Sequence, residues 1–173
     1  MIKFFKMKKV LLAILLVCFC SCEDNSKKIS AAVVSARIEA SSIGIDIMKK
    51  GGNAFDAMVA TDLALSVCYP NAGNIGGGGF LVYRTKAGEV GSLDFREKAP
   101  SKAYEKMFLN PEGYVVKNKS TTGGLSVGVP GTVAGLFEVH GKFCSMPFED
   151  LIQPAIDLAR NGFIVTEKQA KSL

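Results

Sequence analysis

The sequence predicts a mixed α/β (α+β) domain, and three observations support this fold class. Its 173 residues are 48% hydrophobic and 21% charged, which is typical of one globular domain with a buried core. Apolar residues recur at helical spacing in several stretches of the chain. Two short apolar runs on either side of a turn at Ala87-Gly88 indicate a β-hairpin.

The first 21 residues have the pattern of an export signal. Four lysines and no acidic residue occupy positions 1–21, and these lysines precede the apolar run Val10 to Phe19. Ten apolar residues are too few to cross a bilayer, which takes about 20. We therefore expect 1–21 to be a lipoprotein-type signal peptide. Without its four lysines the 21 basic residues fall to 17, against 16 acidic residues, and this balance gives no reason to expect nucleic-acid binding.

A cysteine directly follows this segment. The order Phe19-Cys20-Ser21-Cys22 places a small residue before Cys22, which resembles a bacterial lipoprotein cleavage site. We expect Cys22 to carry lipid and residues 22–30 to form a solvated tether. The protein would then cross the inner membrane and be a periplasmic or outer-membrane-anchored bacterial lipoprotein. The alternative is a cleaved signal peptide that leaves Cys22 unmodified.

The remaining chain begins with a predicted strand and two helices. Val33 and Val34 favour a strand over Ala31 to Ala36. Helical spacing predicts a helix from about Glu39 to Lys50, which Gly51 ends. Asn53 is a suitable N-cap for a second, mostly buried helix that runs to about Cys68.

A glycine-rich segment and a hairpin come next. The hairpin strands are predicted over Phe80 to Tyr83 and Val90 to Phe95. The four glycines Gly76 to Gly79 lie between a helix and a strand, whereas a phosphate-binding loop needs glycines between a strand and a helix. We therefore expect these glycines to let the backbone pass close to another backbone or to a ligand.

The last third of the chain is predicted to be mostly helical. The predicted elements are a turn at Asn110 to Gly113, a loop over Thr121 to Gly131, a helix over Thr132 to His140 ended by Gly141, a helix from Pro147 to Gly162, and a short strand over Phe163 to Val165. The order Thr166-Glu167-Lys168-Gln169 is a capping-box pattern that opens a helix. The chain stops at Leu173 after about two helical turns, which indicates truncation.

Few side chains point to catalysis. Thr121 and Thr122 have no neighbouring base, so a loop role is favoured over that of a nucleophile. His140 is the one histidine, which excludes a multi-histidine metal site and suits a cationic helix cap; no metal or cofactor is expected. Cys68 and Cys144 are expected to be buried thiols, with a disulfide between them as the alternative.

Arg96 is the residue with the clearest binding chemistry. It lies between Asp94 and Glu97, at the end of the second predicted strand. A guanidinium group grips a carboxylate through two parallel hydrogen bonds. From spacing alone, an ion pair with these acidic neighbours is the favoured interpretation, and a bound carboxylate ligand is the alternative.

Five segments together resemble the γ-glutamyltransferase (γ-glutamyl transpeptidase) family. They occur in the family's order and cover nearly all of the chain after the signal. The five segments are 50–57 (KGGNAFDA), 70–80 (PNAGNIGGGGF), 93–100 (LDFREKAP), 128–135 (GVPGTVAG) and 153–163 (QPAIDLARNGF).

The resemblance implies an N-terminal-nucleophile hydrolase with a four-layer αββα sandwich. In this family a zymogen cleaves itself into a large and a small subunit. The new N-terminal Thr of the small subunit attacks the γ-glutamyl carbonyl of glutathione or a related amide. The acyl-enzyme then passes the glutamyl group to water, an amino acid or a peptide. Residues 31–173 would be the N-terminal portion of the large subunit, incomplete as a fold.

The resemblance also assigns one site residue. Arg96 matches the arginine of the family's Asp-Phe-Arg-Glu motif and would bind the α-carboxylate of the glutamyl group. No catalytic residue is assigned, because Thr121-Thr122 precedes Gly123 rather than the histidine of the family's nucleophile motif. The partners implied are a glutathione-like substrate, the remainder of the large subunit, the small subunit, and the membrane through the lipid anchor. The alternative function is a non-catalytic lipoprotein that binds glutamyl peptides or a protein partner, or that is purely structural.

Overall fold

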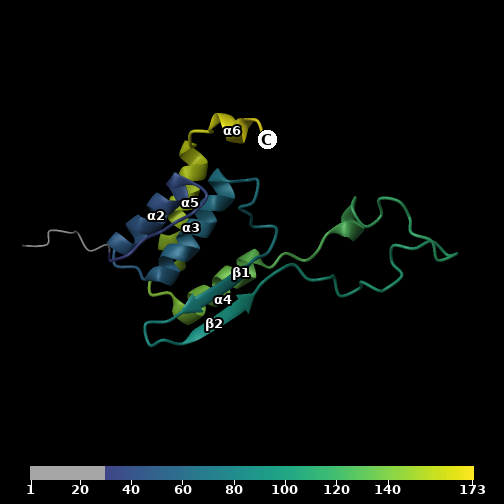
Figure 1. Ribbon diagram of the computed structural model, residues 1–173, viewed down its shortest axis with the longest axis horizontal. Helices are drawn as coiled ribbons and strands as arrows, with labels where there is room; N and C mark the ends of the chain where they lie inside the picture. The colour runs from purple at the N-terminus through teal and green to yellow at the C-terminus, as the bar shows by residue number, and fades with distance from the viewer. Residues whose placement is uncertain (1–29) are drawn as a thin grey trace, which may run out of the picture. The chain divides into compact units, whose positions relative to one another are not determined.

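The computed structural model describes residues 30–173, and Val33–Leu173 form one compact unit (Figure 1). The expected signal peptide, the lipidated Cys22 and most of the tether lie outside the described residues. Within the described part, no helix is long and apolar enough to cross a bilayer.

Three helices form the core of the structure. The helices α2 (Ile38–Lys49), α3 (Ala54–Cys68) and α5 (Phe148–Asn161) lie side by side, and α3 contacts both of the others (Figure 1). Small residues on α3 allow this close approach, since Ala57, Ala60 and Ala64 are all buried. Larger apolar side chains from these helices and from the helix over residues 132–143 fill the remaining space, namely Ile47, Val59, Leu63, Leu136, Val139 and Leu151.

The predicted cap of α3 is confirmed. The Asn53 side chain accepts hydrogen bonds from the backbone N–H groups of Phe55 (2.7 Å) and Asp56 (3.1 Å). The Asp56 carboxylate in turn accepts from the Asn53 N–H at 2.7 Å, which completes a capping box. The same carboxylate accepts from the backbone of Ser145 (3.0 Å) and Met146 (3.1 Å) and from the Ser145 hydroxyl (2.6 Å). Asp56 therefore fixes the connection between α4 (Thr132–Phe143) and α5 to the start of α3.

The predicted hairpin is present. The strands β1 (Phe80–Arg84) and β2 (Val90–Asp94) are antiparallel, with Phe80 opposite Asp94 and Arg84 opposite Val90. Side chains alternate between the two faces of the hairpin. Leu81 and Leu93 on one face pack against the helical core, while the other face is exposed. The hairpin is therefore held to the helices by one face alone.

An extended segment separates the hairpin from α4. Residues 97–130 leave the hairpin, and Figure 1 shows them in green as a long excursion away from the helices. They include the predicted turn near Asn110 and the short 3-10 helix η1 (Gly124–Ser126). An isolated bridge between Lys98 and Val129 joins the two ends of this excursion. The segment is mostly exposed, so few of its own contacts fix its shape.

The structure corrects two predicted strands and one predicted helix end. Neither Ala31 to Ala36 nor Phe163 to Val165 forms a strand, because no strand lies beside them in residues 30–173 to pair with their N–H and C=O groups. Val33 and Phe163 instead pack singly against the buried helices. Gly141 does not end α4, which continues to Phe143.

The C-terminal helix begins as the capping box predicted. In α6 (Glu167–Ala170) the Thr166 hydroxyl accepts from the Gln169 N–H at 3.2 Å. The second half of the box is absent among the described contacts, because the Gln169 side chain is used elsewhere. It donates to the Cys68 carbonyl (2.9 Å) and accepts from Arg37 Nη1 (2.6 Å). This helix is therefore fastened to the ends of α2 and α3.

Candidate active-site segment around Arg96

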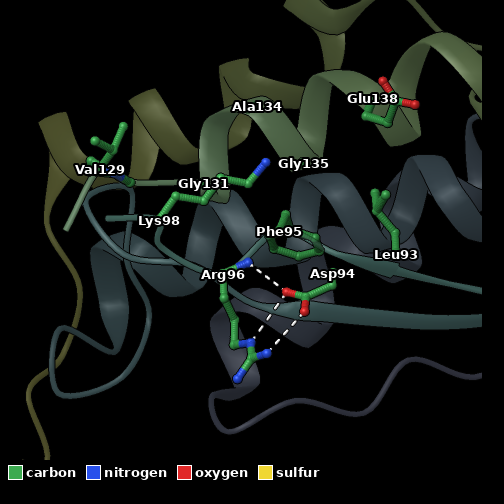
Figure 2. Close-up of a pocket in the computed structure, with 11 residues that line it drawn as sticks. Leu93, Asp94, Phe95, Arg96, Lys98, Val129, Gly131, Ala134, Gly135 and Glu138 are labelled. Carbon is green, nitrogen blue, oxygen red and sulfur yellow. Dashed lines mark hydrogen bonds and ion pairs between the residues drawn. The ribbon is translucent and has the colours of Figure 1, made fainter. Parts of the chain in front are cut away.

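Arg96 lies where the hairpin ends and the chain passes beneath α4. A cavity of about 280 Å³ is lined both by this part of the chain and by α4 (Figure 2). Residues 93–96 and Lys98 line one side of the cavity, and Gly131, Ala134, Gly135 and Glu138 line the other. The cavity therefore brings together two segments of the sequence that carried the family resemblance, 93–100 and 128–135.

Phe95 anchors this segment in a slot formed by glycines. A Cβ atom on Gly79 would lie 2.7 Å from the Phe95 ring, and one on Gly135 would collide with the same ring. A Cβ atom on Gly131 would collide with the Phe95 carbonyl oxygen. Each of these positions admits only glycine at this separation. The backbone on both sides of Phe95 is therefore held at a fixed distance from β1 and α4.

The glycine run contacts Arg96 itself. A Cβ atom on Gly78 would lie 2.5 Å from the Arg96 Cα and 2.8 Å from the Glu97 nitrogen, whereas one on Gly76 would meet nothing within 4 Å. This confirms the prediction that the glycines allow a close approach of two backbones. The glycine run is thus part of the support of Arg96.

A hydrogen-bond network fixes the glycine run to α4. The Asn74 Oδ1 atom accepts from the Gly77 N–H (2.9 Å) and from the Thr132 hydroxyl (2.6 Å). The Gly77 carbonyl accepts from the N–H groups of Gly131 (2.8 Å) and Thr132 (3.1 Å). These two N–H groups are at the start of α4, which has no side-chain cap, so the loop carbonyl satisfies them. Asn74 and Thr132 lie in two segments of the family resemblance, 70–80 and 128–135, and asparagine favours turns, but no sequence pattern predicted the contact between these two side chains.

The Arg96 guanidinium is paired with Asp94 (Figure 2). Arg96 Nε donates to Asp94 Oδ1 at 3.3 Å, and Nη2 donates to Asp94 Oδ2 at 3.1 Å. The backbone N–H of Arg96 also donates to Asp94 Oδ1 at 3.0 Å. The hydrogen bonds from Arg96 lower the pKa of the Asp94 carboxyl, and the hydrogen bond to Asp94 raises the pKa of Arg96. The ion pair expected from spacing is confirmed for Asp94.

The guanidinium nevertheless remains open to solvent. The Arg96 side chain is 60% exposed, and no described residue accepts a hydrogen bond from its Nη1. An arginine carries five N–H donors, of which Asp94 uses only two on this side chain. The site is therefore a positive group with a free donor edge, in an open hollow that Asp94, Glu97 and Lys98 also line, and it suits a carboxylate ligand.

The other candidate residues lie away from this cavity. Thr121 and Thr122 are exposed in the extended segment, in agreement with a loop role. His140 lies in the last turn of α4, near the helix C-terminus as predicted, and its Nε2 is 2.9 Å from the Met146 carbonyl oxygen in the following connection. No group of three metal-ligating side chains occurs in residues 30–173.

Cys68 and Cys144 are both free thiols, as favoured from the sequence; Cys68 is buried as expected, whereas Cys144 is only partly buried. Burial and the nearby Asp56 carboxylate raise the pKa of Cys144 to about 12. Burial also raises the pKa of Cys68. Neither thiol therefore has the low pKa of a reactive cysteine.

Comparison with known proteins places this arrangement in a family. The family model described as Gamma-glutamyltranspeptidase matches residues 40–173. The glutathione hydrolase proenzyme of Escherichia coli K12 is 48% identical over 141 residues, which are 82% of this chain. Those residues are 24% of the relative, so the chain spans about a quarter of that protein.

Solved structures agree with the family match. The γ-glutamyltranspeptidase of Helicobacter pylori is 48% identical with a TM-score of 0.78, over 82% of this chain and 41% of that one. The γ-glutamyltranspeptidase from Pseudomonas nitroreducens, complexed with L-DON, is 44% identical with a TM-score of 0.76, over 82% and 42%. They confirm the predicted fold class, a mixed α/β chain that is part of an N-terminal-nucleophile hydrolase. On its sequence and on its fold, this chain belongs to the gamma-glutamyltranspeptidase family.

Proposed function

We propose that this chain is the N-terminal part of the large subunit of a γ-glutamyltransferase, or glutathione hydrolase, and that Arg96 binds the α-carboxylate of the γ-glutamyl donor. Family membership supports the activity. The single observation that carries the role of Arg96 is its exposed guanidinium with a free donor edge, at an open hollow lined by Asp94, Arg96, Glu97 and Lys98. Residues 31–173 would form the expected large-subunit portion.

The reaction itself would use a nucleophile outside these 173 residues. The N-terminal Thr hydroxyl of the small subunit would attack the γ-carbonyl, with its own α-amine as general base. The amide C–N bond breaks, the amine leaves with the proton, and a glutamyl ester remains on the Thr. Water, an amino acid or a peptide then takes the glutamyl group. In this scheme Arg96 holds the far end of the donor, so it contributes to binding and orientation rather than to bond making.

Arg96→Lys in the full-length enzyme tests the role of Arg96. Lysine keeps the positive charge but loses the planar fork that binds a carboxylate through two hydrogen bonds. We expect kcat/KM for a γ-glutamyl anilide to fall roughly 10-fold to 100-fold. Arg160→Lys is the matched control, because Arg160 is an exposed ion-paired arginine on α5. Unchanged donor kinetics in Arg96→Lys contradict the proposed role.

The chain by itself should have no turnover. The proposed nucleophile is not in these residues, and the exposed hairpin face, with Phe80, Val82 and Val90, favours poor solubility. Incubation of purified residues 22–173 with a γ-glutamyl anilide checks the first point. Release of the aniline by this piece would contradict the division of the enzyme into parts.

The membrane anchor is proposed from the sequence alone. Cys22 would carry lipid, the signal 1–21 would be removed, and the enzyme would be held in the periplasm or at the outer membrane. Mass spectrometry of the mature N-terminus tests this directly. An N-terminus without diacylglycerol on Cys22 would contradict the anchor and leave the activity proposal intact.

A further inference from the structure

We propose that Asp94 and Phe80 are positioning residues that hold the Arg96 guanidinium, so that the donor carboxylate docks on the one edge they leave free. That edge consists of Nη1 and the outer hydrogen of Nη2. The proposal rests on the proposed function of Arg96 and deepens it.

The hairpin register brings the three residues together on one face. Phe80 and Asp94 are directly paired across β1 and β2. Arg96 follows Asp94 by two residues, and side chains two apart in an extended chain point to the same side. Phe95, between them, points to the opposite side into its glycine slot. The fold therefore places an acid and an aromatic ring beside the arginine before any ligand binds.

Asp94 restricts the guanidinium within its own plane. It accepts from Nε and Nη2, which form the side edge of the fork, and its Oδ1 also accepts from the Arg96 backbone N–H. Of the five guanidinium N–H groups, two on Nη1 and one on Nη2 remain. Two of these, one on each Nη atom, are parallel and form the end edge of the fork. A carboxylate that binds through two hydrogen bonds thus has one edge to use.

Phe80 restricts the guanidinium from one side of its plane. The Arg96 Cζ atom lies 4.6 Å from the centre of the Phe80 ring. A cation over an aromatic face is attracted to it, and the contact costs little desolvation at an exposed site. The ring covers one face of the guanidinium and opposes rotation of the side chain. Holding the arginine in place beforehand lowers the ordering cost when the donor binds.

Asp94→Asn and Phe80→Leu in the full-length enzyme test this arrangement. Asparagine keeps one acceptor but loses the charged fork, and leucine keeps the apolar volume but loses the ring. With a γ-glutamyl anilide as donor, we expect KM to rise about 10-fold in Asp94→Asn. We expect a rise of roughly twofold to fivefold in Phe80→Leu. In both variants kcat should change little. Glu89→Gln removes a charge in the hairpin turn and should leave KM unchanged.

The decisive measurement repeats both substitutions in an Arg96→Lys background. If Asp94 and Phe80 act through the guanidinium, each should raise KM much less in that background than in the native one. An equal rise in both backgrounds, or no rise in the native one, overturns the proposal. Unchanged kinetics of Arg96→Lys alone would instead reject the proposed function, so the two failures are distinguishable.

Discussion

Two arginines of this chain, Arg37 and Arg96, are each paired with a nearby carboxylate, but their surroundings differ. Arg37 Nε and Nη2 donate to the Glu39 carboxylate at 3.1 and 2.8 Å, and Arg96 uses the same two nitrogens for Asp94. In both cases the acid is two residues away in the sequence. Yet the Arg37 side chain is 9% exposed and that of Arg96 is 60% exposed.

The difference lies in the remaining donors. Arg37 Nη1 donates to Gln169 Oε1 at 2.6 Å and Nη2 donates to the Ile164 carbonyl at 2.9 Å, so Arg37 joins the start of α2 to the C-terminal segment. Arg96 Nη1 has no such partner among residues 30–173. An arginine with partners at Nε and at both Nη atoms holds the fold, and one with a free edge is available to a ligand. Substitutions near Arg37 should therefore change stability, and those near Arg96 should change donor binding.

The largest expected effect is a loss of stability when Asp56 is replaced. Burial opposes the charge of this carboxylate, but its hydrogen bonds to Ser145, Asn53 and Met146 outweigh burial and lower its pKa. Asp56→Asn places an N–H₂ group against backbone donors and should lower the free energy of unfolding by on the order of 3 kcal/mol. Thermal unfolding of the full-length enzyme checks the effect on stability, and donor KM measured in parallel checks the effect on binding.

The Asp56 carboxylate also predicts a pH dependence. Its pKa in the folded state is below the ordinary value of 3.8, so its stabilisation is complete above about pH 5 and is lost as the pH falls through the folded-state pKa. Asp56→Asn should flatten this part of the acid unfolding profile. Asp62 on the same helix is a matched control, because burial raises its pKa. Asp62→Asn should not destabilise at pH 7, and equal losses in both variants would contradict the assignment.

A single methyl group at Gly78 should have the next largest effect, on the binding side. Its Cβ would lie 2.5 Å from the Arg96 Cα, so the arginine backbone has to move. A displacement of about 1 Å at a binding group costs on the order of 100-fold in rate, and we expect Gly78→Ala to lower donor kcat/KM to that extent. Gly76→Ala adds the same methyl group where nothing lies within 4 Å and should behave like the native enzyme. Similar kinetics of the two variants would remove the glycine run from the support of Arg96.

Arg37→Lys should lower the stability of the fold and leave donor binding unchanged. A lysine ammonium is a single point of charge and does not reach Glu39, Gln169 and the Ile164 carbonyl together. We expect a Tm lower by about 5 °C with donor KM unchanged. Arg160→Lys, at an exposed pair 3.9 Å long, should leave Tm unchanged. A raised donor KM in Arg37→Lys would break the division between the two arginines.

The smallest expected effect concerns the hydroxyl of Thr132. Thr132→Val keeps the shape but loses the 2.6 Å hydrogen bond to Asn74 and leaves the Asn74 oxygen with one donor fewer. We expect donor KM to rise about threefold to fivefold, the equivalent of one hydrogen bond. Thr132→Ser retains the hydroxyl and should restore the native KM. Failure of serine to restore it would show that packing, rather than this bond, matters at Thr132.

Local patterns predicted local structure well. The Asn53 cap, the hairpin strands and the Thr166 helix start all depend on residues within a few positions of one another, and all three are present. The Val33 and Phe163 segments were wrongly predicted as strands, because a strand depends on a distant partner that an apolar run does not specify.

The site was predictable only in part. The pairing of Arg96 with Asp94 follows from residues two apart in the sequence, whereas the binding role of Arg96 was predicted only from the family resemblance. The support of Arg96 by Gly78, and the bond between Asn74 and Thr132, join positions far apart in the chain. No single-sequence pattern of spacing or charge reports such contacts, and only the family resemblance linked these segments beforehand.

The glycine slot around Phe95 also limits how the gene for this protein can vary. Glycine is the smallest residue, so every replacement at Gly79, Gly131 or Gly135 adds atoms where the structure has no room for them. Any substitution at these three positions is therefore expected to disturb the packing of Phe95. Other regions of the protein can exchange a larger residue for a smaller one and be compensated nearby. Because these positions already carry the smallest residue, they should tolerate fewer substitutions than other positions in a mutational library of this protein.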